Sequence, residues 1–203
     1  MVHSAKSIAR KIRAGNDGDV NGIAVIPSPD LALLEHSGEA SVSLRLGRWF
    51  LVLRQAKIHV LELLPGSGET EGKYGKQSFV PFGATFTLHP GRFVLASTLE
   101  WIRLPSNCSA VVVGKSTLGR RGIIIETAAG VHPGFSGCLT LEIANVGELP
   151  VSLVAGMLIC QLFFHPVEGD LGDGKTGLAG QRKPRLGTIR EDATLASLLR
   201  SRR

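Results

Sequence analysis

Four short segments of the chain carry residue types that could do chemistry. The first runs from Gly169 to Thr176 (GDLGDGKT) and satisfies the Walker A pattern letter for letter. A Walker A loop needs a helix after it, because the helix N-terminus holds the phosphates. Here glycines and a proline follow and oppose a helix, and Asp170 and Asp173 would repel a phosphate. We therefore do not expect a P-loop.

The second segment is Gly114 to Gly122 (GKSTLGRRG), which follows an apolar run typical of a strand. A turn that presents backbone amides, hydroxyls and cations suits a phosphate chain. The same composition also fits a solvated basic loop. The candidate contacts in this segment are Lys115, Ser116, Thr117 and Arg120.

The third segment is Cys138 to Asn145 (CLTLEIAN), in which apolar and other residues alternate. In a strand, the leucine and isoleucine side chains would point to one side, so Thr140 and Glu142 would share the other. If that face lines a pocket, Glu142 can serve as general base and general acid. The alternative is an ordinary exposed glutamate on a strand.

The fourth segment is Thr127 to Phe135 (TAAGVHPGF). Its small residues, Ala128 and Ala129 among them, would let the backbone approach a flat ligand closely. His132 is either a ligand contact or a turn histidine without a chemical role.

The elements that must position these segments are mainly strands. Ser4 to Gly15 predicts one short helix, because an apolar stripe recurs at helical spacing between a capping serine and a glycine. No helical pattern of ten or more residues follows between Gly47 and Phe164. Short apolar runs separated by turn residues predict a closed or double-sheeted all-β domain. The predicted strands are 40–47, 49–53, 58–64, 79–80, 93–96, 111–113, 122–126, 138–145, 151–153 and 157–164, with a solvent loop at 65–76 and a possible terminal helix at 190–200.

Composition supports one globular domain with a tail. The chain has 203 residues, of which 43% are hydrophobic and 20% charged. No apolar run is long enough to span a membrane. Three cysteines, at 108, 138 and 160, argue against a disulfide scaffold and for a reducing compartment. We expect a cytoplasmic protein with no membrane partner.

The positive charge is concentrated at the C-terminal end. Residues 171–203 hold eight Lys and Arg against three acidic residues, whereas residues 1–170 hold fifteen against fourteen. We expect a β domain over 1–168 and a flexible basic tail over 169–203. The near-neutral body argues against a nucleic-acid surface, although a basic tail could contact nucleic acid.

Taken in order, these segments resemble the dCTP deaminase branch of the dUTPase superfamily. The resemblance spans about residues 4–187 and is densest between 87 and 164. The matching stretches are ASVSLRLG near residue 40, TLHPGRFVLASTLEWIRLP from Thr87, GKSTLGRRG from Gly114, TAAGVHPGFSGCLTLEIANVGELPVSLVAGMLICQLFF from Thr127 and GQRKP from Gly180.

The resemblance implies an all-β, dUTPase-like distorted jelly-roll (β-clip) domain with a short N-terminal helix and a C-terminal lid. It also implies a homotrimer whose active sites are shared between neighbouring subunits. The implied reaction is zinc-independent deamination of dCTP to dUTP, with Mg²⁺ arriving on the triphosphate and dTTP a candidate inhibitor. The sequence has neither H-x-E nor P-C-x-x-C, which the zinc deaminases use.

The resemblance also assigns roles to the candidate residues. Glu142 would move protons at the cytosine, Ser116 would position the water or the base, and Arg120 would supply positive charge. The resemblance favours a deaminase over a dUTPase, because dUTPases usually have an aliphatic residue where Glu142 stands. The implied substrate-binding residues are Lys115, Thr117, Ala128, Ala129, His132 and Gln181, the last from the lid.

Three departures from the family pattern leave alternatives open. His132 stands where the family usually has an Asp that contacts the deoxyribose, and Ser43 replaces another usual Asp. Leu178-Ala179 replaces an aromatic and polar pair before the lid motif. The alternatives are a non-catalytic nucleotide-binding or regulatory relative, and a bifunctional deaminase and dUTPase.

Overall fold

The structure is a computed structural model of the whole chain. It describes residues 2–54, 60–61, 63, 74–125, 129–169, 180–187, 189 and 192–200. Several predictions fall outside these residues. They are most of the strand at 58–64 and the loop at 65–76, most of the Walker A match, Leu178-Ala179 and the candidate contact Ala128.

The predicted N-terminal helix is confirmed as α1 (Ala5–Asn16). It begins after Ser4, whose hydroxyl oxygen accepts a hydrogen bond from the Ser7 amide at 3.4 Å. Gly15 packs so closely on the following chain that a Cβ would lie 2.3 Å from the Ile23 carbonyl oxygen, so only glycine fits there. The buried stripe of the helix is Ala5, Ile8, Ala9 and Ile12.

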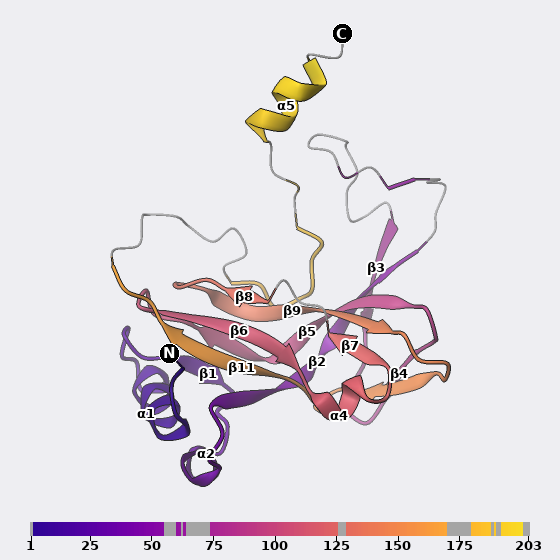
Figure 1. Cartoon of the computed structure of the whole chain (residues 1–203). Coiled ribbons are helices and arrows are strands. Elements are labelled where there is room, and N and C mark those ends of the chain that lie inside the picture. Colours follow the sequence, from indigo (N-terminus) through magenta and orange to yellow (C-terminus); the bar gives the residue numbers. More distant parts are fainter. Residues whose placement is uncertain are drawn as a thin grey trace.

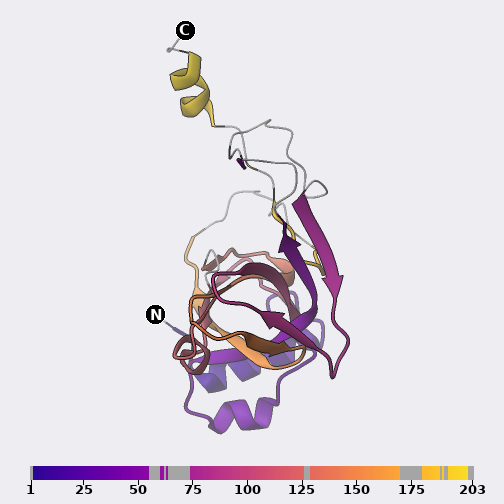
Figure 2. The same ribbon diagram turned by 90° about the vertical axis from the view of Figure 1, so that its right-hand side faces the viewer.

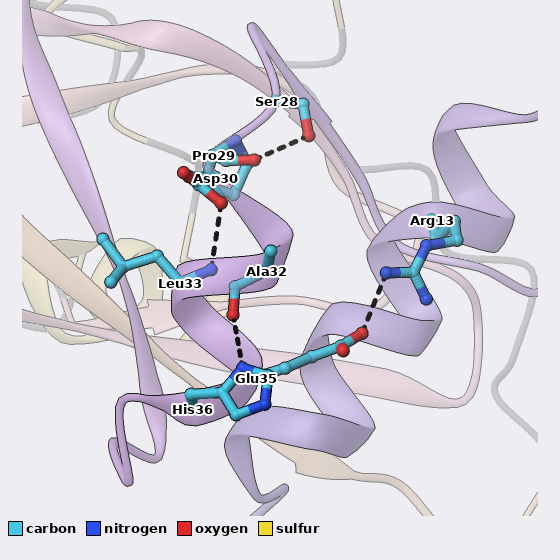
Figure 3. A network of polar contacts seen from close by, with 8 residues as sticks. All are labelled: Arg13, Ser28, Pro29, Asp30, Ala32, Leu33, Glu35 and His36. Atoms are coloured by element: carbon cyan, nitrogen blue, oxygen red, sulfur yellow. Dashed lines mark hydrogen bonds and ion pairs between the residues drawn. The ribbon is translucent and has the colours of Figure 1, made fainter.

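A second short helix, α2 (Leu31–His36), packs beside α1 (Figure 3). No helix is predicted here from the sequence, where Pro27 and Pro29 interrupt the chain. Asp30 nevertheless caps the helix, since its carboxylate accepts a hydrogen bond from the Leu33 amide at 2.9 Å. Arg13 Nη2 donates to Glu35 Oε1 at 2.8 Å and joins the two helices. This ion pair is largely exposed and contributes at most about 1 kcal/mol.

The strands are β1 (Ala24–Ile26), β2 (Ser41–Leu53), β3 (Gly75–Phe79), β4 (Thr85–Leu88), β5 (Phe93–Arg103), β6 (Cys108–Gly114), β7 (Ile123–Ile125), β8 (Gly130–Val131), β9 (Ser136–Asn145), β10 (Val151–Val154) and β11 (Leu158–Pro166). The remaining helices are α4 (Ser116–Gly119) and α5 (Ala193–Arg200).

The strands pair antiparallel and curl into a barrel-like body, seen end-on in Figure 2. The main sheet has the order β7-β9-β5-β2-β11-β6-β8, with β1 paired to β5 and β3 paired to β2. A separate two-stranded sheet contains β4 and β10. Figure 1 shows α1 and α2 together on one side of this body, with α5 well away from it.

The core fills the inside of the curled sheet. Phe50 of β2 and Phe164 of β11 are fully buried, and Phe50 stacks on Phe86 with ring centroids 4.4 Å apart. β9 contributes Leu139, Leu141 and Ile143 to the same core. These contacts hold β9 rigidly along one of its faces.

Two local predictions are corrected. The sequence predicted separate strands at 40–47 and 49–53, but β2 is continuous through Gly47. A Cβ at Gly47 would lie 2.7 Å from the Ser97 carbonyl oxygen, so the glycine permits close strand approach and marks no turn. The short strands β1, β4 and β8 were not predicted.

Candidate active site

Strand β9 carries Glu142 on its outer face. Burial alternates strictly along this strand, with Leu139, Leu141 and Ile143 buried and Thr140 and Glu142 half-buried. The antiparallel register places Glu142 opposite Leu95 of β5 and Thr140 opposite Ser97. The sequence alternation had predicted this division of faces, and the structure bears it out. Glu142 is therefore a carboxylate fixed on a strand whose other face is anchored in the core.

The C-terminal segment lies along β9 beside this carboxylate. The Gly180 amide donates to the Ser136 carbonyl oxygen at 2.6 Å, and the Cys138 amide donates to the Gln181 carbonyl oxygen at 2.7 Å. Gln181 Nε2 donates to Thr140 Oγ1 at 2.9 Å. Gln181 Oε1 is buried and has no hydrogen-bond partner among the described residues. The segment thus adds to the edge of β9 and brings an amide oxygen close to the Glu142 face.

The same segment continues over β2 and β3. Lys183 Nζ lies 3.9 Å from the centroid of the Trp49 ring, a cation–π contact. Gln77 Nε2 donates to the Pro184 carbonyl oxygen at 3.0 Å, and Pro184 is buried. Sequence reasoning missed Trp49, Gln77 and Lys183 as contacts. Their spacing carries no signal, because the contacts join strands to a segment more than 100 residues away.

The basic segment 114–122 forms a turn that contains α4. β6 leads into it and β7 leads out of it. The Lys115 amide donates to the Ile159 carbonyl oxygen at 3.4 Å, and the Arg120 amide donates to the Ser116 carbonyl oxygen at 3.0 Å. Ser116, Thr117 and Arg120 are exposed, and Lys115 is half-buried. The turn therefore presents its hydroxyls and cations to solvent.

The segment 129–135 lies beside β6. The Ala129 carbonyl oxygen accepts a hydrogen bond from the Val112 amide at 2.9 Å. His132 is exposed in a turn, where Gly134 has a positive φ of 72°. The His132 carbonyl oxygen accepts from the Phe135 amide at 3.2 Å. The side chain of His132 thus faces solvent in the isolated chain.

One chain brings some of the predicted residues together and leaves others apart. Glu142 and the side chain of Gln181, which is bonded to Thr140, both lie on the outer face of β9. The α4 turn packs on β7, which pairs with residues 143–145 of β9, whereas residues 180–181 are hydrogen-bonded to residues 136–140 of the same strand.

Burial sets the protonation of three groups in the sheet. Burial is the main reason why the pKa of Glu100 lies above its ordinary value. Burial also raises the pKa of the Cys138 thiol on the Glu142 face, and it raises the pKa of Cys160 to about 12. Both cysteines are therefore thiols at neutral pH and poor nucleophiles.

Within the described residues, His, Cys, Asp and Glu side chains form no group of three or more that could hold a metal ion. Among the same residues, no helix is both long and apolar enough to cross a membrane.

The chain is similar to known proteins in sequence and in fold. A family model described as dCTP deaminase-like matches residues 2–167. A dCTP deaminase from Natronomonas pharaonis is 36% identical over 198 residues, which cover 95% of this chain and 96% of the relative. A dUMP-forming dCTP deaminase from Corynebacterium glutamicum is 37% identical over 91% of this chain and 94% of its own length.

A solved structure shows the same fold. The 2′-deoxycytidine 5′-triphosphate deaminase from Agrobacterium tumefaciens matches with a TM-score of 0.57 at 21% identity, over 82% of this chain. This chain spans about half of that protein, since the match covers 48% of it. The likeness confirms the predicted fold class. From the family match and the relatives of similar length, the chain belongs to the dCTP deaminase-like family.

Proposed function

We propose that this protein hydrolyses dCTP to dUTP and ammonia. The observation that carries the proposal is the position of Glu142 on the outer face of β9, two residues from the threonine to which Gln181 is hydrogen-bonded. A carboxylate on a rigid strand, beside a segment that can close over a ligand, suits acid–base chemistry on a bound base. The names of the relatives in the family support the same reaction.

In this mechanism Glu142 takes a proton from a water molecule as the water oxygen bonds to C4 of cytosine. Glu142 passes that proton to the ring nitrogen N3. It then moves the proton of the new C4 hydroxyl to the amino group, which leaves as ammonia when the C4–N bond breaks. Ser116 holds the water or the base, and Arg120 stabilises the charge that develops in the transition state.

The triphosphate is assigned to the α4 turn and the C-terminal segment. Lys115 and Thr117 contact the phosphates, and Gln181 closes over them. Mg²⁺ enters as part of the substrate, bound to the triphosphate. The contacts to base and sugar are assigned to Ala128, Ala129 and His132.

The proposed active form is a homotrimer with shared sites. The resemblance to dCTP deaminases supports this arrangement. A closed ring of copies would place the α4 turn of one subunit against β9 of its neighbour. The expected mass in light scattering is three times the chain mass of 21.6 kDa.

The test is a product analysis with a matched pair of variants. Purified protein is incubated with Mg²⁺ and dCTP, dCMP, CTP or dUTP, and the products are separated by chromatography. We expect dCTP to give dUTP and ammonia. Glu142→Gln should lower kcat by at least about 100-fold, because the amide cannot take a proton.

Glu148→Gln is the control, because Glu148 is an exposed glutamate in the turn after β9. Full activity in Glu142→Gln would refute the proposed role of Glu142, but it would not refute the assignment of dCTP as the substrate. Nucleotide that is bound but not converted would instead support a non-catalytic binding protein. Formation of dUMP from dCTP would show that the triphosphate is also cleaved.

A further inference from the structure

Strand β5 is bulged against β9 at residues 98–100, and its pairing with β2 is irregular at the preceding residue, Ser97. Against β9, the register passes from Ser97 opposite Thr140 to Trp101 opposite Cys138, so residues 98–100 all lie opposite Leu139. Against β2, the register shifts between Leu46 and Phe50. A bulge of this kind takes main-chain acceptors out of the ladder.

Two side chains of the bulge replace the missing acceptors. Thr98 Oγ1 accepts a hydrogen bond from the Leu139 amide at 2.9 Å, on the β9 side. Glu100 Oε2 accepts one from the Arg45 amide at 2.9 Å, on the β2 side. Thr98 Oγ1 also donates to the Glu100 carbonyl oxygen at 2.9 Å, which joins the two bonds. Thr98 is 1% exposed and Glu100 is 5% exposed, so water does not compete for these bonds.

The neighbouring strand is shaped to fit the bulge. A Cβ at Gly47 of β2 would lie 2.7 Å from the Ser97 carbonyl oxygen and 2.8 Å from that of Thr98. β2 can therefore approach only because residue 47 has no side chain. The bulge is therefore held by a hydrogen bond from β9 on one side and by one from β2 on the other.

The bulge pairs with β9 at Leu139, between the two residues to which the C-terminal segment is hydrogen-bonded. Leu139, which donates to Thr98, lies between Cys138 and Thr140. Cys138 donates its amide to the Gln181 carbonyl oxygen, and Thr140 accepts from the Gln181 side chain. The Leu139 bond thus holds the middle of a three-residue docking segment, and Glu142 follows on the same strand.

We propose that Thr98 and Glu100 are positioning residues, which fix β9 so that Gln181 docks beside Glu142. They act through β9 and do not touch the substrate. The kinetic consequence rests on the proposed deaminase function, but the docking of the C-terminal segment does not.

The test replaces Thr98 by valine, which keeps the shape and removes the hydroxyl, and by serine, which restores it. Trypsin cleavage after Arg182 reports docking without any need for activity, whereas the bond after Lys183 resists trypsin because Pro184 follows it. We expect Thr98→Val to speed this cleavage about tenfold and to raise KM for dCTP about tenfold with a smaller change in kcat. Thr98→Ser should return both values to within about twofold of wild type.

Thr87→Val is the matched control, because Thr87 is exposed on β4, and it should change neither value. A Thr98→Val protein with lowered Tm but wild-type cleavage and KM would overturn the proposal, since the threonine would then be purely structural. Faster cleavage in a protein that never converts dCTP would support the docking role and refute the proposed function.

Hydrogen exchange on the wild-type protein gives a second test that needs no variant to fold. The Leu139 and Cys138 amides should both be strongly protected. If the Cys138 amide exchanges freely while the Leu139 amide stays protected, the bulge does not govern docking of the C-terminal segment. If the Leu139 amide exchanges freely, its hydrogen bond to Thr98 does not form.

Discussion

Glu100 is a carboxylate inside the sheet, paired with the Arg45 main-chain amide. Burial is the largest influence on its pKa and raises it, while the bond from Arg45 and the Arg45 charge lower it less. The folded protein therefore holds this proton more tightly than the unfolded chain does. Stability from this group is complete below the ordinary pKa of 4.5 and is lost as pH rises through the raised value.

Glu100→Gln removes the titration and keeps an oxygen that can accept from Arg45. We expect wild type to lose stability relative to this variant as pH is raised from about 4 to 7.5. Urea denaturation at several pH values measures the difference. Parallel stability curves for the two proteins would show that Glu100 does not titrate with a raised pKa.

β9 ends at a second buried polar group, Asn145, which is 1% exposed. Its Nδ2 donates to the carbonyl oxygens of Leu88 and Leu149, both at 2.9 Å. Its Oδ1 accepts from the Gly147 amide at 3.0 Å. This one side chain joins the end of β9 to β4 and to the turn that follows.

Asn145→Ala should lower the free energy of unfolding by about 2–4 kcal/mol, because it leaves three main-chain groups without a partner in a buried place. Chemical denaturation measures the loss. Asn107→Ala is the control at an exposed asparagine and should stay within about 0.5 kcal/mol. Equal stability of the two variants would mean that water replaces the Asn145 bonds.

At the scale of the whole molecule, the proposed chemistry draws on two elements, β9 and the α4 turn. Glu142 and Gln181 share the outer face of β9, and Ser116 and Arg120 project from the α4 turn. We propose that neighbouring copies complete each other's sites. That condition can be tested by mixing inactive subunits.

Co-expressed Glu142→Gln and Arg120→Ala chains, each inactive alone, should give mixed trimers with activity. In a mixed trimer of either composition, one of the three subunit interfaces has both residues intact, so about one third of wild-type activity is expected. Product formation from dCTP measures it, after two different tags have selected mixed particles. Mixed trimers without activity would place the whole site within one chain.

The local features of this protein could be predicted from its sequence. The alternation of Leu139, Leu141 and Ile143 with Thr140 and Glu142 predicted which face of β9 is buried, because side chains alternate along any strand. The apolar stripe of α1 predicted its length and its buried side for a similar reason. The family and the candidate residues followed from the order of several motifs.

Only the tertiary structure decided which of these residues meet. Gln181 reaches Thr140, and Lys183 reaches Trp49, across separations that no periodicity encodes. The bulge at Thr98 and Glu100 depends on how three strands pack side by side, with Gly47 allowing their approach. A sequence pattern indicates on which face of its helix or strand a residue lies. Long-range contacts depend on how the strands curl and pack against one another, and that geometry exists only in the folded chain.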